Sequence, residues 1–90
     1  VISWNTNQKS LIHDHPDNGC LFKVLVGNLN ENIYDVDLNL IQIKCLSKDG
    51  ISYIEGKHNL HNIENNSYDM ATVSLHIYSP PNYKPLFYLS

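Results

Sequence analysis

Turn-forming residues interrupt this chain at short intervals, and the runs between them are short and rich in β-branched and aromatic residues. No stretch of helical length repeats its apolar residues with a period of about 3.6 residues. We therefore expect strands at residues 1–4, 11–14, 20–26, 32–36, 40–46, 51–54, 62–64, 71–78 and 86–89. Short strands at spacings of roughly 8–12 residues predict an all-β barrel or sandwich.

The length of the chain limits it to one domain, residues 1–90, with a thin core, because so short a chain buries only about 60–65% of its unfolded surface. Since position 1 is valine, we expect a partial domain. The two cysteines, Cys20 and Cys45, are too few for a disulfide scaffold, so both are expected as reduced thiols.

Charge and hydropathy narrow the possible partners. The net charge is −3, and the six basic residues are scattered lysines, so we expect no nucleic-acid binding. No apolar run reaches the roughly 18 residues of a membrane span, and no signal sequence opens the chain. We expect a cytoplasmic monomer without membrane contact.

Two histidines stand two positions apart, His13 and His15, in the stretch SLIHDHPDNGCLFKVLVGN. On a strand this spacing points both imidazoles to one side, where they could chelate one ion such as Fe(II), Zn(II) or Cu(II). An isolated pair of this kind is at least as common by chance or on a surface, so a third ligand is needed. The other histidines are His58, His61 and His76.

The expected strand at 71–78, ATVSLHIY, has one polar and one aliphatic face. Alternation places Ser74, His76 and Tyr78 on the polar face. On alternation alone, the favoured arrangement has the aliphatic face in the core and the polar trio in water. In the alternative, the trio lines the interior of a ligand-bearing barrel, and further chain or a partner covers the aliphatic face.

The spacing of several residues resembles the two motifs of the cupin family, G(X)5HXH(X)3–4E(X)6G and G(X)5PXG(X)2H(X)3N. Cys20 stands where the first motif has glutamate, and Asn7, Gly56 and His58 stand at three other motif positions. The residues that keep the intervals are His13, His15, Gly27, Gly50, His61 and Asn65. The resemblance implies a cupin-type β-barrel, or jelly roll.

Cysteine at the glutamate position, together with the segments YIEGKHNLHNIEN and TVSLHIYSPP, resembles the cysteine dioxygenase family of the eukaryotic type. The likeness runs from about Trp4 to Pro81. It implies that His13, His15 and His61 bind a mononuclear Fe(II), with O2 as co-substrate.

The same resemblance assigns roles outside the ligand set. It implies a thioether crosslink between Cys20 and Tyr78. It also implies a catalytic hydrogen-bonded relay of Ser74, His76 and Tyr78, the trio that alternation places on one strand face. Trp4 matches a family tryptophan and is expected in the core.

The implied activity is that of a thiol dioxygenase, which adds both atoms of O2 to the sulfur of L-cysteine and gives cysteine sulfinate, in cysteine catabolism and taurine biosynthesis. Three neutral imidazoles leave half of a six-coordinate shell open and the metal charge uncompensated, which suits a thiolate substrate. Two alternatives stay open. One is a dioxygenase for another small thiol, such as 3-mercaptopropionate, and the other is a metal-binding cupin fragment without turnover.

The chain departs from the family at its substrate anchor. The family binds the substrate carboxylate with an arginine on a helical segment before the first motif, whereas this chain contains no arginine. Lys9 is a poor substitute, because lysine lacks a planar pair of donors. Either the arginine lies on the helical segment in upstream sequence that is missing here, or the protein has lost its substrate anchor. The last strands of the family are also expected to be absent or diverged, because the segment NYKPLFYLS after the Ser–Pro–Pro turn is short. Asp14 is expected to point away from the two histidines, either to solvent or behind the ligands.

Overall fold

The computed structural model describes residues 2–15, 19–54, 60–67, 70–78 and 87–88. The strands within these ranges are β1 (Ile2–Trp4), β2 (Ile12–His13), β3 (Cys20–Val26), β4 (Leu29–Tyr34), β5 (Leu40–Leu46), β6 (Ile51–Ile54), β7 (Leu60–Glu64), β8 (Thr72–Tyr78) and β9 (Phe87–Tyr88). Among the described residues there is no helix with the length and hydropathy needed to span a bilayer.

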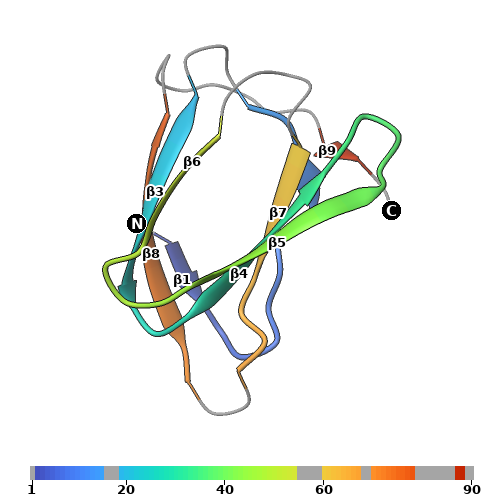
Figure 1. The fold of residues 1–90 in the computed structure, drawn as a ribbon. Coiled ribbons are helices and arrows are strands. Elements are labelled where there is room, and N and C mark those ends of the chain that lie inside the picture. Colours follow the sequence, from blue (N-terminus) through green and yellow to red (C-terminus); the bar gives the residue numbers. More distant parts are fainter. Residues whose placement is uncertain (1, 16–18, 55–59, 68–69, 79–86, 89–90) are drawn as a thin grey trace.

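The strands form two antiparallel sheets. One sheet has the order β1-β8-β3-β6, and the other has the order β5-β4-β7-β2-β9. Figure 1 shows the two sheets on opposite sides of a common interior. Many neighbours in the sheets are distant in sequence, as in the pairing of β3 with β8 and of β4 with β7. The prediction of an all-β barrel or sandwich is confirmed.

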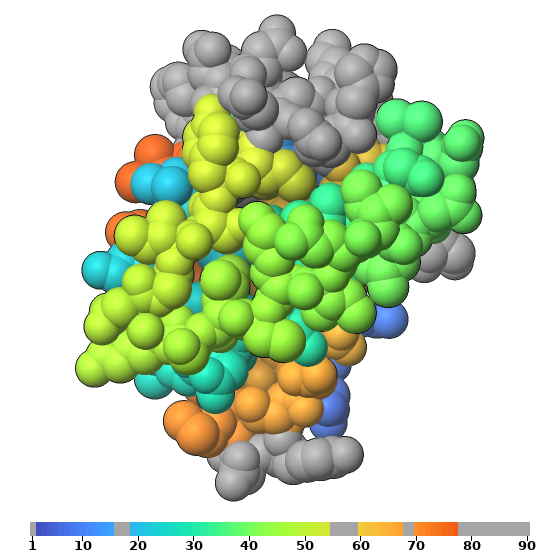
Figure 2. Space-filling model, in the orientation of Figure 1, coloured from blue at the N-terminus to red at the C-terminus, as the bar shows by residue number. Residues whose placement is uncertain are grey.

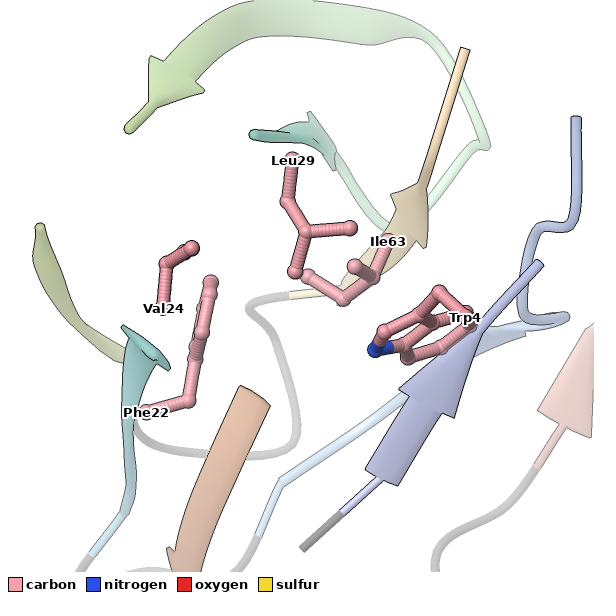
Figure 3. Packing of buried hydrophobic residues seen from close by; sticks show 5 residues of the cluster. All are labelled: Trp4, Phe22, Val24, Leu29 and Ile63. Carbon is pink, nitrogen blue, oxygen red and sulfur yellow. The ribbon is translucent and has the colours of Figure 1, made fainter. Parts of the chain in front are cut away.

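The core joins the two sheets through a small cluster of buried side chains, shown in Figure 3. Trp4, Phe22 and Val24 come from the first sheet, whereas Leu29 and Ile63 come from the second. Alternation along β3 explains why Phe22 and Val24 are in the core, because buried and outward-facing residues follow each other along this strand with a period of two. The expectation that Trp4 lies in the core is confirmed.

The strand positions follow the sequence closely, with three differences that concern the site. β7 begins at Leu60, two residues before its expected start, and so includes His61. β4 begins at Leu29, three residues before its expected start, because Gly27 adopts a φ of +81° and turns the chain within a short loop. β2 is shorter than expected and ends at His13, so His15 follows the strand instead of lying in it.

The structure reverses the arrangement that alternation alone favours for β8. Ser74 is fully buried, whereas Leu75 is 36% and Ile77 is 56% exposed on the outer surface of the sheet. The polar face turns inward because it meets polar and aromatic partners from β1 and β3, the indole of Trp4 and the ring of Phe22. The side chain of Tyr78 lies outside the described residues, and the strand carries its backbone.

The outer surfaces carry further exposed aliphatic side chains. Figure 2 shows that the segment from β5 to β6, in green to yellow, makes up much of the face seen in that view. Ile41 and Ile43 of β5 and Ile51 of β6 are all more than half exposed on this segment. The interior between the sheets is therefore the place where buried polar groups gather.

Candidate metal centre

Three histidines meet in the interior, at the edge of the core. His13 of β2 and His61 of β7 are directly opposite each other in the sheet, and His15 follows β2. The Nε2 atom of His61 lies 2.9 Å from Nε2 of His15 and 3.1 Å from Nε2 of His13. All three side chains are buried. The structure thus brings together the three histidines that the sequence intervals single out.

The spacing of these nitrogens fits a shared metal ion. Imidazole nitrogens at about 2.1 Å from one ion lie about 3.0 Å apart where they subtend a right angle at the ion, and about 3.4 Å apart in a tetrahedron. The two separations of 2.9 Å and 3.1 Å match the right angle. The donor set therefore fits two right angles at one ion, with the possible ligand atoms of all three histidines within 4.8 Å of one another.

Hydrogen bonds on the far side of two rings orient the ligand nitrogens. Nδ1 of His13 lies 2.8 Å from the carbonyl oxygen of Leu11. Nδ1 of His61 lies 2.7 Å from Oε2 of Glu31. Both oxygens can only accept, so each Nδ1 carries the proton and each Nε2 presents a lone pair to the cluster.

Glu31 is the residue of this site that the sequence prediction missed. It lies on β4, is fully buried, and also accepts a hydrogen bond from the hydroxyl of Ser52 on β6. Burial acts to raise the pKa of Glu31, but the hydrogen bonds from His61 and Ser52 outweigh it and hold the pKa below its usual value. The sequence prediction started this strand at residue 32. Had it started at residue 29, alternation would have placed Glu31 on the same face as Leu29 and indicated a buried charge.

Burial keeps the nearby imidazoles neutral. The pKa of His13 is lowered to about 4, first by burial and then by the neighbouring His61. The pKa of His76 is likewise lowered to about 4, first by burial and then by His61. At neutral pH both rings are uncharged, so His13 needs to lose no proton before it binds a cation.

A second polar chain runs along the inner face of β8. The indole N–H of Trp4 donates to Oγ of Ser74 over 2.9 Å, and that oxygen lies 2.7 Å from Nε2 of His76. Because an indole N–H can only donate, the Ser74 hydroxyl keeps its own proton for His76. When the hydroxyl donates to Nε2 in this way, the proton of the neutral His76 ring lies on Nδ1. The ring of Phe22 stacks on His76 with centroids 5.1 Å apart.

The backbone places Cys20 and Tyr78 directly opposite each other on β3 and β8. Opposite residues of an antiparallel pair project to the same face, with Cβ atoms about 4.5–5.5 Å apart. The side chain of Cys20 is buried. Cys45 is exposed on β5 in the other sheet and is not joined to Cys20.

Asp14 and His58 also belong to the histidine-rich segments. Asp14 is buried, which excludes the solvent-exposed position that was one of its two expected places. His58 lies outside the described residues.

Comparison with solved structures supports the fold. The Drosophila melanogaster CENP-C cupin domain superposes with a TM-score of 0.72 at 18% identity, over 86% of this chain and 56% of that chain. The Drosophila melanogaster CENP-C structure bound to CAL1 gives the same TM-score of 0.72 and 18% identity, over 61% of that chain. At this identity the likeness establishes the fold alone, and it confirms the prediction of a cupin-type jelly roll.

Comparison with known sequences identifies the family. The family model described as cysteine dioxygenase type I matches residues 1–86. Cysteine dioxygenase type 1 of Rattus norvegicus is 36% identical over an alignment of 87 residues that covers 90% of this chain and 44% of the relative. The enzymes named cysteine dioxygenase type 1 from Homo sapiens and Bos taurus are 37% and 38% identical over the same shares. The chain spans less than half the length of these curated relatives, and it belongs to the cysteine dioxygenase type I family.

Proposed function

We propose that residues 1–90 form the metal-binding domain of a thiol dioxygenase that converts L-cysteine to cysteine sulfinate, with His13, His15 and His61 holding Fe(II). The observation that carries the proposal is the convergence of Nε2 of His61 with the other two Nε2 atoms, at 2.9 Å and 3.1 Å. Family membership supports the reaction type and the substrate class. We further propose that this domain belongs to a monomeric enzyme of cysteine catabolism in the cytoplasm.

The ligand set suits a thiol substrate. When bound, Fe(II) would supply the redox chemistry by which both atoms of O2 pass to the substrate sulfur. Three neutral imidazoles bring no negative charge to a divalent ion, so a substrate thiolate is electrostatically favoured beside it. The buried surroundings strengthen that attraction, because little water competes for the charges.

The polar chain on β8 would direct Tyr78. Ser74 holds the His76 ring by its Nε2 and leaves an Nδ1 proton on the side away from Ser74. Tyr78 follows His76 on the same face of the strand, two residues along. We propose that His76 positions the Tyr78 hydroxyl and that this hydroxyl hydrogen-bonds the bound substrate. Ser74 and Trp4 then act as positioning residues, because they reach the phenol only through His76.

The activity can be tested directly. The protein is loaded with Fe(II) without oxygen, and O2 uptake is then followed after addition of L-cysteine, with cysteine sulfinate measured by mass spectrometry. We expect uptake that depends on both iron and cysteine. Uptake with 3-mercaptopropionate but not with cysteine would show a different thiol substrate. Tight metal binding without thiol-dependent uptake would show a non-catalytic cupin.

We also propose a thioether between Sγ of Cys20 and the ring of Tyr78, supported by their opposite positions on β3 and β8. The bond would form with loss of the thiol hydrogen and one ring hydrogen, two electrons and two protons in all, which O2 would accept. The crosslinked protein should run apart from the linear form on a denaturing gel. It should also weigh less by two hydrogen atoms.

Cys20→Ser is expected to collapse that doublet to the linear band, because serine offers no sulfur to the ring. Cys45→Ser is the matched control, since Cys45 is the other cysteine and lies exposed on β5. This control should keep both bands. A single band at the linear mass in the iron-loaded, oxygen-exposed wild type would rule the crosslink out.

A further inference from the structure

We propose that Glu31 is a positioning residue for the metal centre. It would fix the orientation and tautomer of His61 and make this imidazole a stronger donor than His13. The inference rests on the proposed function, because it presupposes that the three histidines bind a metal ion. It adds a fully buried carboxylate from β4 to the site.

The geometry is that of a carboxylate behind a metal-ligating histidine. Oε2 of Glu31 lies 2.7 Å from Nδ1 of His61, on the side of the ring opposite to the cluster. Such outer partners orient the ring and raise the basicity of the ligand nitrogen. The carboxylate is itself held, because the hydroxyl of Ser52 donates to its other oxygen, Oε1. Glu31 therefore cannot turn away from His61 without losing this second hydrogen bond.

Sheet pairing fixes the approach of the two side chains. Residues 33 and 61 are directly opposite in the pairing of β4 with β7, and Glu31 lies two residues along β4 from that point. Glu31 and His61 are thus diagonal neighbours on one face of the sheet, within reach of long side chains. The contact joins segments 30 residues apart in sequence.

The histidines differ in what stands behind them. Nδ1 of His13 donates to a neutral acceptor, the carbonyl oxygen of Leu11. Nδ1 of His61 donates to an ionised carboxylate, whose hydrogen bond is stronger because it carries a charge. The two imidazoles should therefore donate unequally to a bound ion, with more electron density from His61.

A purely structural role does not explain why a carboxylate occupies this buried position. Glu31 occupies the inward face of β4 in line with Leu29, a member of the hydrophobic core. An aliphatic side chain would fill such a place without the cost of burying a charge. The hydrogen bonds of Glu31 go to a proposed metal ligand and to the serine that holds it in place.

The test compares metal affinity and reduction potential in matched variants. Glu31→Gln keeps the size of the side chain but removes its charge. We expect it to weaken Co(II) or Fe(II) binding about 10- to 100-fold. The control is Glu64→Gln, which removes a half-buried carboxylate at the end of β7 whose partner is the amide of Asn32. This control should bind metal within about twofold of the wild type, and circular dichroism checks the fold of both proteins.

The reduction potential of the iron reports the charge of Glu31 beside the metal. A nearby negative charge stabilises Fe(III) more than Fe(II), so its loss in Glu31→Gln should make the potential more positive. A side chain that only fills space would not change the potential, and the Nδ1 proton of His61, measured below, separates positioning of the ring from a purely through-space effect. Wild-type affinity and an unshifted potential in Glu31→Gln would overturn the inference while leaving the proposed metal site intact. A wild-type protein that binds neither Co(II) nor Fe(II) would overturn both.

Two further measurements do not depend on Glu31→Gln folding. Ser52→Ala keeps the charge but frees Oε1, so we expect a smaller loss of affinity, several-fold at most. In the Zn(II)-loaded wild type, nitrogen NMR of the histidine rings should show a retained Nδ1 proton on His61, at lower field than that of His13. Metal bound through Nδ1 of His61, or an Nδ1 proton that exchanges freely with water, would contradict the role of Glu31.

Discussion

His61→Ala is expected to weaken metal binding at this site about a hundredfold. Nε2 of His61 lies 2.9 Å from Nε2 of His15 and 3.1 Å from Nε2 of His13. Its loss would leave two histidines without the nitrogen that lies close to both. A four-ligand zinc site binds with roughly 10–16 kcal/mol, or about 3 kcal/mol for each ligand, which is about a hundredfold in affinity. Titration with Co(II) or anaerobic Fe(II) measures this loss. O2 uptake with L-cysteine should vanish with it.

His76→Gln is the matched control for this experiment. His76 is also an inward-facing histidine with a pKa lowered to about 4, but its Nε2 is engaged by Ser74. Its replacement should leave metal affinity within a few-fold of the wild type and should reduce uptake, because it leaves Tyr78 without the proposed positioning group. Unchanged metal affinity in a folded His61→Ala protein would show that the ligand set is wrong.

Local signals in the sequence predicted where the strands lie, but not which face of a strand is buried. Turn residues and alternation are properties of neighbouring residues, and they placed β3, β5 and β6 with the bounds that the structure has. Alternation says which side chains share a face, and not which face is inside. For β8 the outcome depended on Trp4 and Phe22, which come from other strands.

The histidine cluster was predictable because motif intervals carry long-range information that single strands do not. The intervals from His15 to His61 link two strands of one sheet, and the structure brings both residues to one point. The motif also includes Asn65, and only the structure shows what this residue does. Its buried side-chain amide donates to the carbonyl oxygens of Trp4, Asn5 and Met70, and so ties three loop and strand ends together.

Glu31 could not be found in this way. A lone glutamate within NLNENIY has the composition of a polar turn, and Gly27 makes the preceding turn shorter than its sequence suggests. The contact with His61 depends on the register of β4 against β7. Register is a tertiary property, fixed by burial of one sheet face and by turn geometry. The partner behind a ligand histidine is therefore visible only once the strands are paired.

Phe22→Ala is expected to destabilise the folded protein by about 3–5 kcal/mol, the usual cost of removing a buried phenylalanine ring. Phe22 is buried in the cluster that joins the two sheets, and its ring stacks on His76. At roughly 0.05–0.15 kcal/mol per residue, a chain of 90 residues has about 5–13 kcal/mol of stability, so the loss is a large share. Urea unfolding of the metal-free protein measures it.

Phe22→Leu is the control that separates packing from ring stacking. Leucine refills much of the cavity, so we expect a smaller loss of stability than with alanine. Leucine does not restore the flat surface against His76, so cysteine-dependent uptake should stay low in both variants. Equal stability of Phe22→Ala and the wild type would contradict the core assignment, and full uptake in Phe22→Leu would show that the ring does not hold His76. Phe22 thus links the thin core to the relay, because one ring closes the core on one side and supports His76 on the other.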